Sequence, residues 1–148
     1  MKIALKYGLM ITAGIATWVL IAHALVPNPE SKVHSLGAGM VFNLLEILFI
    51  YLGIKARRSE NAGQLNFKEG IKTGVSIAFV YAVSSCLFFV FELFLFGPKL
   101  MASKAEGQTR PFWQVTFMAF AGLFSFALLF GLFYSTVIAF ALAKRRQR

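Results

Sequence analysis

Acidic residues and cysteine are scarce in this sequence. Its 148 residues include six acidic side chains, all of them glutamate, and a single cysteine, Cys86. One cysteine excludes an internal disulfide framework and the paired spacings of cysteine metal sites. Cys86 lies inside an apolar run, where a thiol behaves as a small hydrophobic side chain. The four prolines all fall between the long apolar runs, so no proline interrupts those runs.

Charged residues as a whole are also few, and hydrophobic residues take their place. Hydrophobic residues make up 58% of the chain and charged residues 14%, whereas soluble domains carry roughly 25% charged residues. The charges collect between four apolar stretches instead of spreading along the chain. This pattern indicates an all-α, polytopic membrane protein.

Each of the four apolar stretches is long enough to cross a bilayer, which takes about 20 residues of helix. The predicted spans are 5–26, 36–56, 71–96 and 112–143, in a single domain covering residues 1–148. They leave outer loops at 27–35 and 97–111 and a cytoplasmic loop at 57–70. The first run also resembles a secretory leader, with a basic start and the segment "AHA" at 22–24. We expect it to remain as a membrane span.

The chain has a net charge of +9, and the positions of its basic residues predict the orientation of these spans. Lys and Arg are retained on the cytoplasmic side of membrane proteins, and with four crossings eleven of the fifteen basic residues fall on one side. We therefore predict that both termini are cytoplasmic, in a bacterial inner membrane, and we do not expect nucleic acid as a partner. The residues expected to contact lipid headgroups or a partner subunit on that side are Lys55, Arg57, Arg58, Lys68, Lys72, Lys144, Arg145 and Arg146.

The polar segment 55–74, "KARRSENAGQLNFKEGIKTG", is expected to be a charged hinge between two membrane helices. Residues 59–63, "SENAG", have the chemistry of a turn, since Asn and Gly tolerate positive φ. Asn66 with Glu69 three residues later is typical of a helix start. The segment has no phosphate-binding glycine loop, and a surface for docking a partner is the alternative.

A resemblance to a known family is carried by the same region. The segment "YLGIKARRSENAGQLNFKEGIKTG" at 51–74, together with "KYGL" at 6–9, resembles the family catalogued as domain of unknown function 4199. That resemblance implies a small bacterial membrane protein with four helices along nearly the whole chain. It implies no enzyme, because the family has no established activity.

Ionisable residues within a span are costly to insert and are candidate functional groups. Three are present: His23, Glu46 and Glu92. Glu46 falls near the middle of the second span, with Asn43 one turn before it on the same face. Glu46 could join helices through hydrogen bonds, take part in a proton or cation relay, or contact a partner subunit. His23 and Glu92 are expected at similar depth near the outer ends of their spans, where Glu92 could extend to the interface or pair with His23.

We predict no metal or cofactor, while a bound lipid or pigment stays an open alternative. A neutral imidazole such as that of His23 is a common metal ligand. However, bis-histidine haem needs a second histidine in a span, and His34 is expected in the outer loop 27–35.

Small residues recur every four positions in the last two spans, as they do where membrane helices pack closely. The pairs are Gly74 with Ala78, Ala78 with Ala82, and Gly131 with Ser135. Seventeen phenylalanines provide broad apolar surfaces, which suit contact with lipid, with another protein's helices or with a pigment.

No set of nucleophile, base and orienting group is apparent, so we do not expect an enzyme. The interpretation we favour from sequence is an accessory or scaffold subunit of a larger membrane complex, for which a respiratory or photosynthetic electron-transfer complex is a natural host. The alternative is a small proton- or cation-coupled transporter or channel that uses Glu46. Expected partners are membrane lipids and other membrane-protein subunits.

Overall fold

The computed structural model describes residues 1–25, 32–96 and 112–144, and the regular structure within these ranges is entirely α-helical. The helices are α1 (Lys2–Leu25), α2 (Lys32–Glu60), α3 (Phe67–Phe96) and α5 (Phe112–Lys144). Each of the four is long and apolar enough to cross a membrane. The prediction of an all-α protein with four membrane-spanning helices is confirmed.

The helices do not stop where the apolar runs stop. α2 begins at Lys32 and ends at Glu60, and α3 begins at Phe67, so the polar connection between them is shorter than the predicted loop 57–70. The physical reason is that an apolar run records hydrophobic length, whereas a helix continues through polar residues until a turn ends it. For the same reason the expectation that His34 lies in a loop is wrong, since residue 34 belongs to α2.

The connection between α2 and α3 is a hydrogen-bonded turn. Positive φ falls at Ala62 (51°) and Gly63 (80°), so Gly63 adopts it as expected and Ala62 adopts it in place of Asn61. The Gly63 amide donates to the Arg58 carbonyl at 3.0 Å, and the Arg58 Nε donates back to the Gly63 carbonyl at 2.9 Å. This arrangement ends α2 as a left-handed C-cap does. Glu69 in the first turn of α3 accepts a hydrogen bond from the Asn61 amide at 3.2 Å, which ties the two helix ends together.

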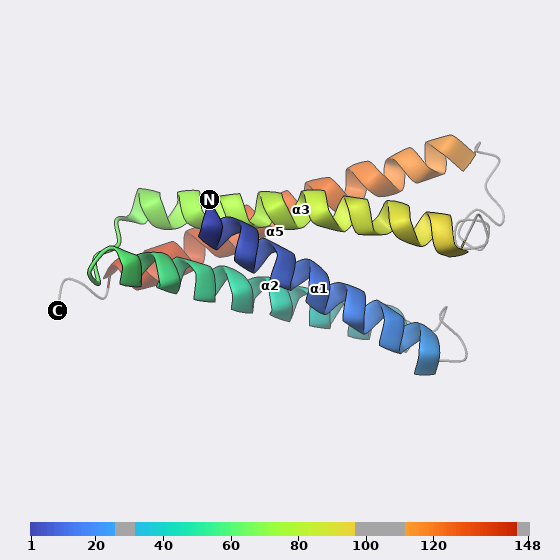
Figure 1. Ribbon diagram of the computed structural model, residues 1–148, viewed down its shortest axis with the longest axis horizontal. Helices are drawn as coiled ribbons and strands as arrows, with labels where there is room; N and C mark the ends of the chain where they lie inside the picture. Colours follow the sequence, from blue (N-terminus) through green and yellow to red (C-terminus); the bar gives the residue numbers. More distant parts are fainter. Residues whose placement is uncertain (26–31, 97–111, 145–148) are drawn as a thin grey trace.

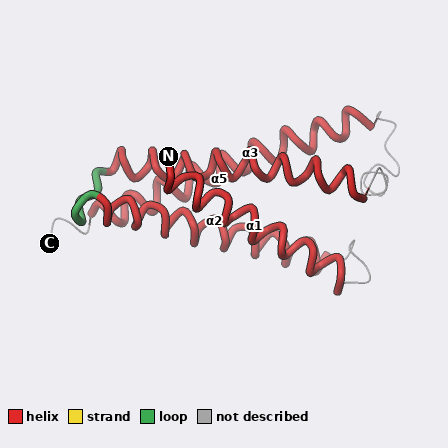
Figure 2. The backbone as a smooth tube through the Cα atoms, in the orientation of Figure 1, coloured by secondary structure: helices red, strands yellow, loops and turns green. Residues whose placement is uncertain are grey.

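The four helices form two antiparallel hairpins, α1–α2 and α3–α5, which lie close together near the turn and diverge toward their other end (Figure 1). α1 crosses between its neighbours: its Gly8 faces Val80 of α3, and its Gly14 faces Leu45 of α2. The start of α1 lies at the same end as the turn, because Met1 and Lys2 line a groove with Arg57. Figure 2 shows the turn as the described loop joining α2 to α3.

The closest helix contact is a ladder of small residues between α3 and α5. A Cβ added at Gly70 would lie 2.7 Å from that of Ala139, and Cβ atoms at Gly74 and Gly131 would overlap Ser135 and Ala78 respectively. The steps advance by four residues on one helix and retreat by four on the other, as antiparallel helices require. The predicted small-residue packing of Gly74, Ala78, Gly131 and Ser135 is therefore confirmed.

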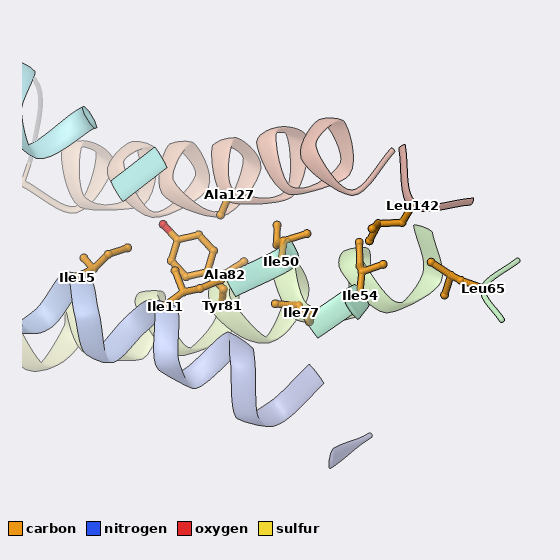
Figure 3. Packing of buried hydrophobic residues seen from close by; sticks show 10 residues of the cluster. All are labelled: Ile11, Ile15, Ile50, Ile54, Leu65, Ile77, Tyr81, Ala82, Ala127 and Leu142. Atoms are coloured by element: carbon orange, nitrogen blue, oxygen red, sulfur yellow. The ribbon is translucent and has the colours of Figure 1, made fainter. Parts of the chain in front are cut away.

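The core lies mainly in the half of the bundle nearest the turn. Ile11, Ile50, Ile54 and Ile77 are fully buried there. Leu65 in the turn packs into the same cluster as Leu142 near the end of α5, as the close view shows (Figure 3). Outward-facing positions are as apolar as the core, which is expected of helices surrounded by hydrocarbon rather than water. The exposed set includes Leu44, Phe79, Phe94, Phe117, Phe126, Leu129 and Phe140.

Candidate functional site

Glu46 is the middle residue of α2, and its side chain is only 4% exposed. It shares the inward face of α2 with Ile50 and Ile54, which lie one and two turns further along. The carboxyl lies beside α5 at Gly131, where an added Cβ would be 3.2 Å from Glu46 Oε1. The missing side chain at Gly131 is therefore what leaves room for an acid at this depth.

One oxygen of this carboxyl, Glu46 Oε1, is buried without a hydrogen-bond partner. Among the described residues it shares this property with the indole nitrogen of Trp18. Buried polar atoms in proteins are nearly always paired, so each exception needs an explanation. The Glu46 oxygen is the more notable of the two because it belongs to an ionisable acid, whereas the Trp18 nitrogen belongs to a neutral indole.

Glu46 lines a cavity of about 310 Å³ that receives side chains from all four helices. Its lining residues belong to the half of the bundle away from the turn, and the two hairpins diverge toward that end (Figure 1). Its polar lining residues are Asn43, Glu46, Tyr81, Ser85 and Glu92. Its aromatic lining residues are Phe42, Phe88, Phe89, Phe126 and Phe130. Below Glu46, the buried isoleucines of the core fill the space toward the turn.

Asn43 lines the same cavity, yet both ends of its amide are already used. The Tyr134 hydroxyl of α5 donates to Asn43 Oδ1 at 2.5 Å, and Asn43 Nδ2 donates to the Gly39 carbonyl at 2.7 Å. Asn43 and Glu46 therefore share a face of α2, as the spacing predicts, but the amide connects α2 to α5. Asn43 positions the wall of the cavity.

A cluster of hydroxyl groups joins α1 to α3 beside the cavity. Thr12 Oγ1 lies 2.6 Å from Ser84 Oγ and 3.4 Å from Ser85 Oγ. Ser84 also donates to the Val80 carbonyl at 2.7 Å, and the Ser85 hydroxyl hydrogen-bonds Tyr81 one turn earlier. Tyr81 of α3 lines the same cavity as Glu46. In Figure 3 the Tyr81 hydroxyl points across the bundle toward α5.

The second acid, Glu92, is half-buried and lines the same cavity nearer the end of α3. The structure therefore brings the two carboxyls of the membrane segments into one site, an arrangement that the sequence interpretation did not anticipate. That interpretation considered Glu92 with His23. α1 and α3 do pack together, but the His23 side chain lies outside the described part of the chain.

Sequence reasoning also missed Tyr81 of α3, which lines the cavity with Glu46, and Tyr134 of α5, which bonds Asn43 at its wall. A usable signal was present, because both tyrosines carry a hydroxyl within a long apolar run, where it needs an internal partner. Their relation to Glu46 depends on which helices are neighbours, and helix order is not encoded in hydropathy. Of the described residues, no three His, Cys, Asp or Glu side chains lie close enough to bind a metal ion.

The predicted basic contact residues gather around the turn. Lys55, Lys68 and Lys72 are exposed. Arg57 donates to the Glu60 carboxylate at 3.2 Å, with both side chains about half exposed, while Arg58 caps the turn. Lys144 ends α5, with its side chain outside the described part, and Arg145 and Arg146 lie outside the described residues altogether.

Comparison with known proteins gives one match. The model of a family described as a protein of unknown function (DUF4199) matches residues 6–144, which covers all four helices. No curated protein and no solved structure matches the chain.

Proposed function

The chain belongs to the DUF4199 family of proteins of unknown function, and from the geometry of its cavity we propose that it binds and moves a proton or a cation across a membrane, with Glu46 as the binding group. The proposal is for a non-enzymatic, multi-pass protein of the bacterial inner membrane.

The observation that carries this proposal is that Glu46 lines a cavity while one of its carboxyl oxygens is buried without a hydrogen-bond partner. An acid in the hydrocarbon region is expensive, by roughly 2.5–3.5 kcal/mol on insertion scales. A purely structural carboxyl would be expected to recover that cost by using both oxygens in hydrogen bonds. A carboxyl that lines a cavity and keeps one oxygen without a partner is instead suited to a group that arrives and departs.

The rest of the bundle supports a gated site. Isoleucines with no exposed surface close the path from Glu46 toward the turn, while the cavity lies toward the opposite end. α3 and α5 are interlocked by the small-residue ladder, and the proposal is that the α1–α2 hairpin moves against them by breaking the hydroxyl contacts between α1 and α3. Transfer across the membrane would require the hairpins to close at one end and open at the other, as in alternating access.

The test is a flux measurement on the full chain in proteoliposomes, with a pH-sensitive dye inside and an imposed cation or proton gradient. Glu46→Gln should abolish the flux while the protein elutes and melts like the parent. Glu60→Gln is the matched control, since it removes an acid that pairs with Arg57 at the exposed turn. Absence of flux in the parent, or equal flux in Glu46→Gln, would rule out the proposal.

A second candidate function is that of an accessory subunit in a larger membrane complex, and a separate observation favours it. An apolar groove of about 800 Å³ runs between α3 and α5 on the outside of the bundle, lined by Trp113, Phe117 and Phe120 among others. Such a groove suits the side chains of a neighbouring helix. Native electrophoresis of mildly solubilised membranes should then find the chain in one large complex, and a band containing this chain alone would exclude it.

A further inference from the structure

We infer that the cavity takes a hydrophobic organic monocation, an amine or quaternary ammonium group attached to an apolar body. The inference rests on the proposed function, because it names the ligand class of the same site.

The walls of the cavity favour such a ligand over an inorganic ion. Small metal cations in proteins take about six oxygen ligands, and the described cavity offers few oxygens that are not already engaged. The amide of Asn43 bonds Tyr134 and Gly39, and the Ser85 hydroxyl is shared with its neighbours. Most of the lining is aromatic or aliphatic. Aromatic faces attract ammonium groups and also accommodate an apolar body.

The size of the cavity points the same way. At about 310 Å³ it falls at the lower end of small-molecule pockets, which run from roughly 300 to 1,000 Å³. A single ion at Glu46 would leave most of that volume empty, whereas a small aromatic amine would occupy it.

The acids of the site favour a positively charged group. Glu46 supplies an acid at the buried end, and Glu92 places a second acid further along the same wall. No Lys, Arg or His lies among the described residues that line the cavity, so no fixed cation there competes for Glu46.

Binding a cation at Glu46 also moves a proton. A buried carboxyl with no cation beside it is in its neutral, protonated form. Only the carboxylate form offers a full negative charge, so the proton leaves Glu46 for bulk water as the cation takes its place. The titratable groups that face this exchange are Tyr81 and Glu92 from α3 and Tyr134 from α5, while α1 contributes Ile15 and Val19 to the wall. Cation affinity should consequently rise with pH, and each cation bound should release a proton.

The experiment uses the full chain in nanodiscs of zwitterionic lipid, titrated calorimetrically with phenyltrimethylammonium in two buffers that differ in ionisation enthalpy. The parent should bind saturably, and the difference between buffers should report proton release. Glu46→Gln should weaken binding by roughly tenfold or more, whereas Glu60→Gln should not. tert-Butylbenzene, the neutral isostere, should not displace the cation. Glu46→Asp, which keeps the charge but shortens the side chain, should bind more weakly and still release a proton.

The remaining outcomes of the titration and of the flux measurement distinguish a wrong ligand class from a wrong proposed function. Equal binding in Glu46→Gln and the parent, displacement by tert-butylbenzene, or binding by Glu46→Asp without proton release would overturn the inference, because the cavity would then be only an apolar trap. If phenyltrimethylammonium fails to bind while a Glu46-dependent flux persists, the ligand class is wrong and the proposed function stands. If binding and flux are both absent, both proposals fail.

Discussion

At the residue scale, the polar groups inside the bundle fall into two kinds. Asn43, Thr12 and Ser84 have their hydrogen bonds filled by neighbouring helices or by their own backbone. Glu46, in contrast, has a buried oxygen without a hydrogen-bond partner. Groups of the first kind join helices where no water is available to replace the bond. The second kind, the Glu46 oxygen, can still accept a hydrogen bond or bind a cation.

The contact between Asn43 and Tyr134 gives a prediction at this scale. It connects α2 to α5 at 2.5 Å, and interhelical hydrogen bonds in membrane proteins contribute about 0.6 kcal/mol on average and up to about 1.7. A double-mutant cycle with Asn43→Ala and Tyr134→Phe, read from reversible unfolding in mixed detergent, should give a coupling free energy of about 1 kcal/mol. A coupling close to zero would mean that the bond contributes nothing net.

Sequence alone identified Glu46 and Asn43 because a polar residue in an apolar run is conspicuous. It could not assign their partners, since Tyr134 is far from Asn43 in the chain and is brought there only by helix order. The same limit explains why Glu92 was considered with His23 and not with the cavity that it shares with Glu46.

At the element scale, α3 and α5 are held together by close packing of their backbones at small residues, and not by large side chains. Three successive steps of the ladder place a small residue against a small residue, and aromatic pairs such as Phe89 with Phe120, centroids 5.5 Å apart, flank it. Hydrocarbon gives helices no hydrophobic reason to associate, so close backbone approach and dispersion contacts hold this pair. Spacing of four along each run predicted this interface from sequence. The facing pairs follow only once the register is known.

Enlarging one step of the ladder should separate the two helices. Gly131→Ala places a methyl group against Ala78, and overpacking of this kind costs roughly 1–3 kcal/mol. Gly122→Ala is the matched control, because nothing lies within 4 Å of an added Cβ there. It should be neutral or stabilising by up to roughly 1 kcal/mol, since alanine favours a helix more than glycine does. Thermal unfolding of both variants in detergent checks the contrast, and equal melting temperatures would contradict it.

At the scale of the whole molecule, the architecture was predictable because hydropathy reports membrane crossings directly. The helix ends were not, because α2 and α3 continue through polar residues until the turn at Ala62 and Gly63 stops them. The side of the membrane that the turn faces is a prediction from charge, namely that it is cytoplasmic.

Cysteine labelling tests that orientation. Gln64 is exposed in the turn, so Gln64→Cys in a Cys86→Ser background places one thiol at this end. A membrane-impermeant maleimide should label it in inside-out vesicles and leave it unlabelled in intact cells. The parent chain is the control, since Cys86 is buried. Labelling in intact cells would reverse the topology.

The divergence of the two hairpins has a mechanical consequence. The described helices meet near the turn and spread toward the other end (Figure 1), so in a bilayer the bundle would have a wider cross-section in one leaflet than in the other. Any movement that changes their angle changes the area the protein occupies in each leaflet, and lateral pressure acts on that difference. Membrane tension would then shift the equilibrium between a narrower and a wider arrangement of the hairpins, in proportion to the difference in their areas. A ligand shifts such an equilibrium in the same way, through its different affinity for the two states. The lipid would therefore not only surround this bundle but also exert a force on the angle between its hairpins.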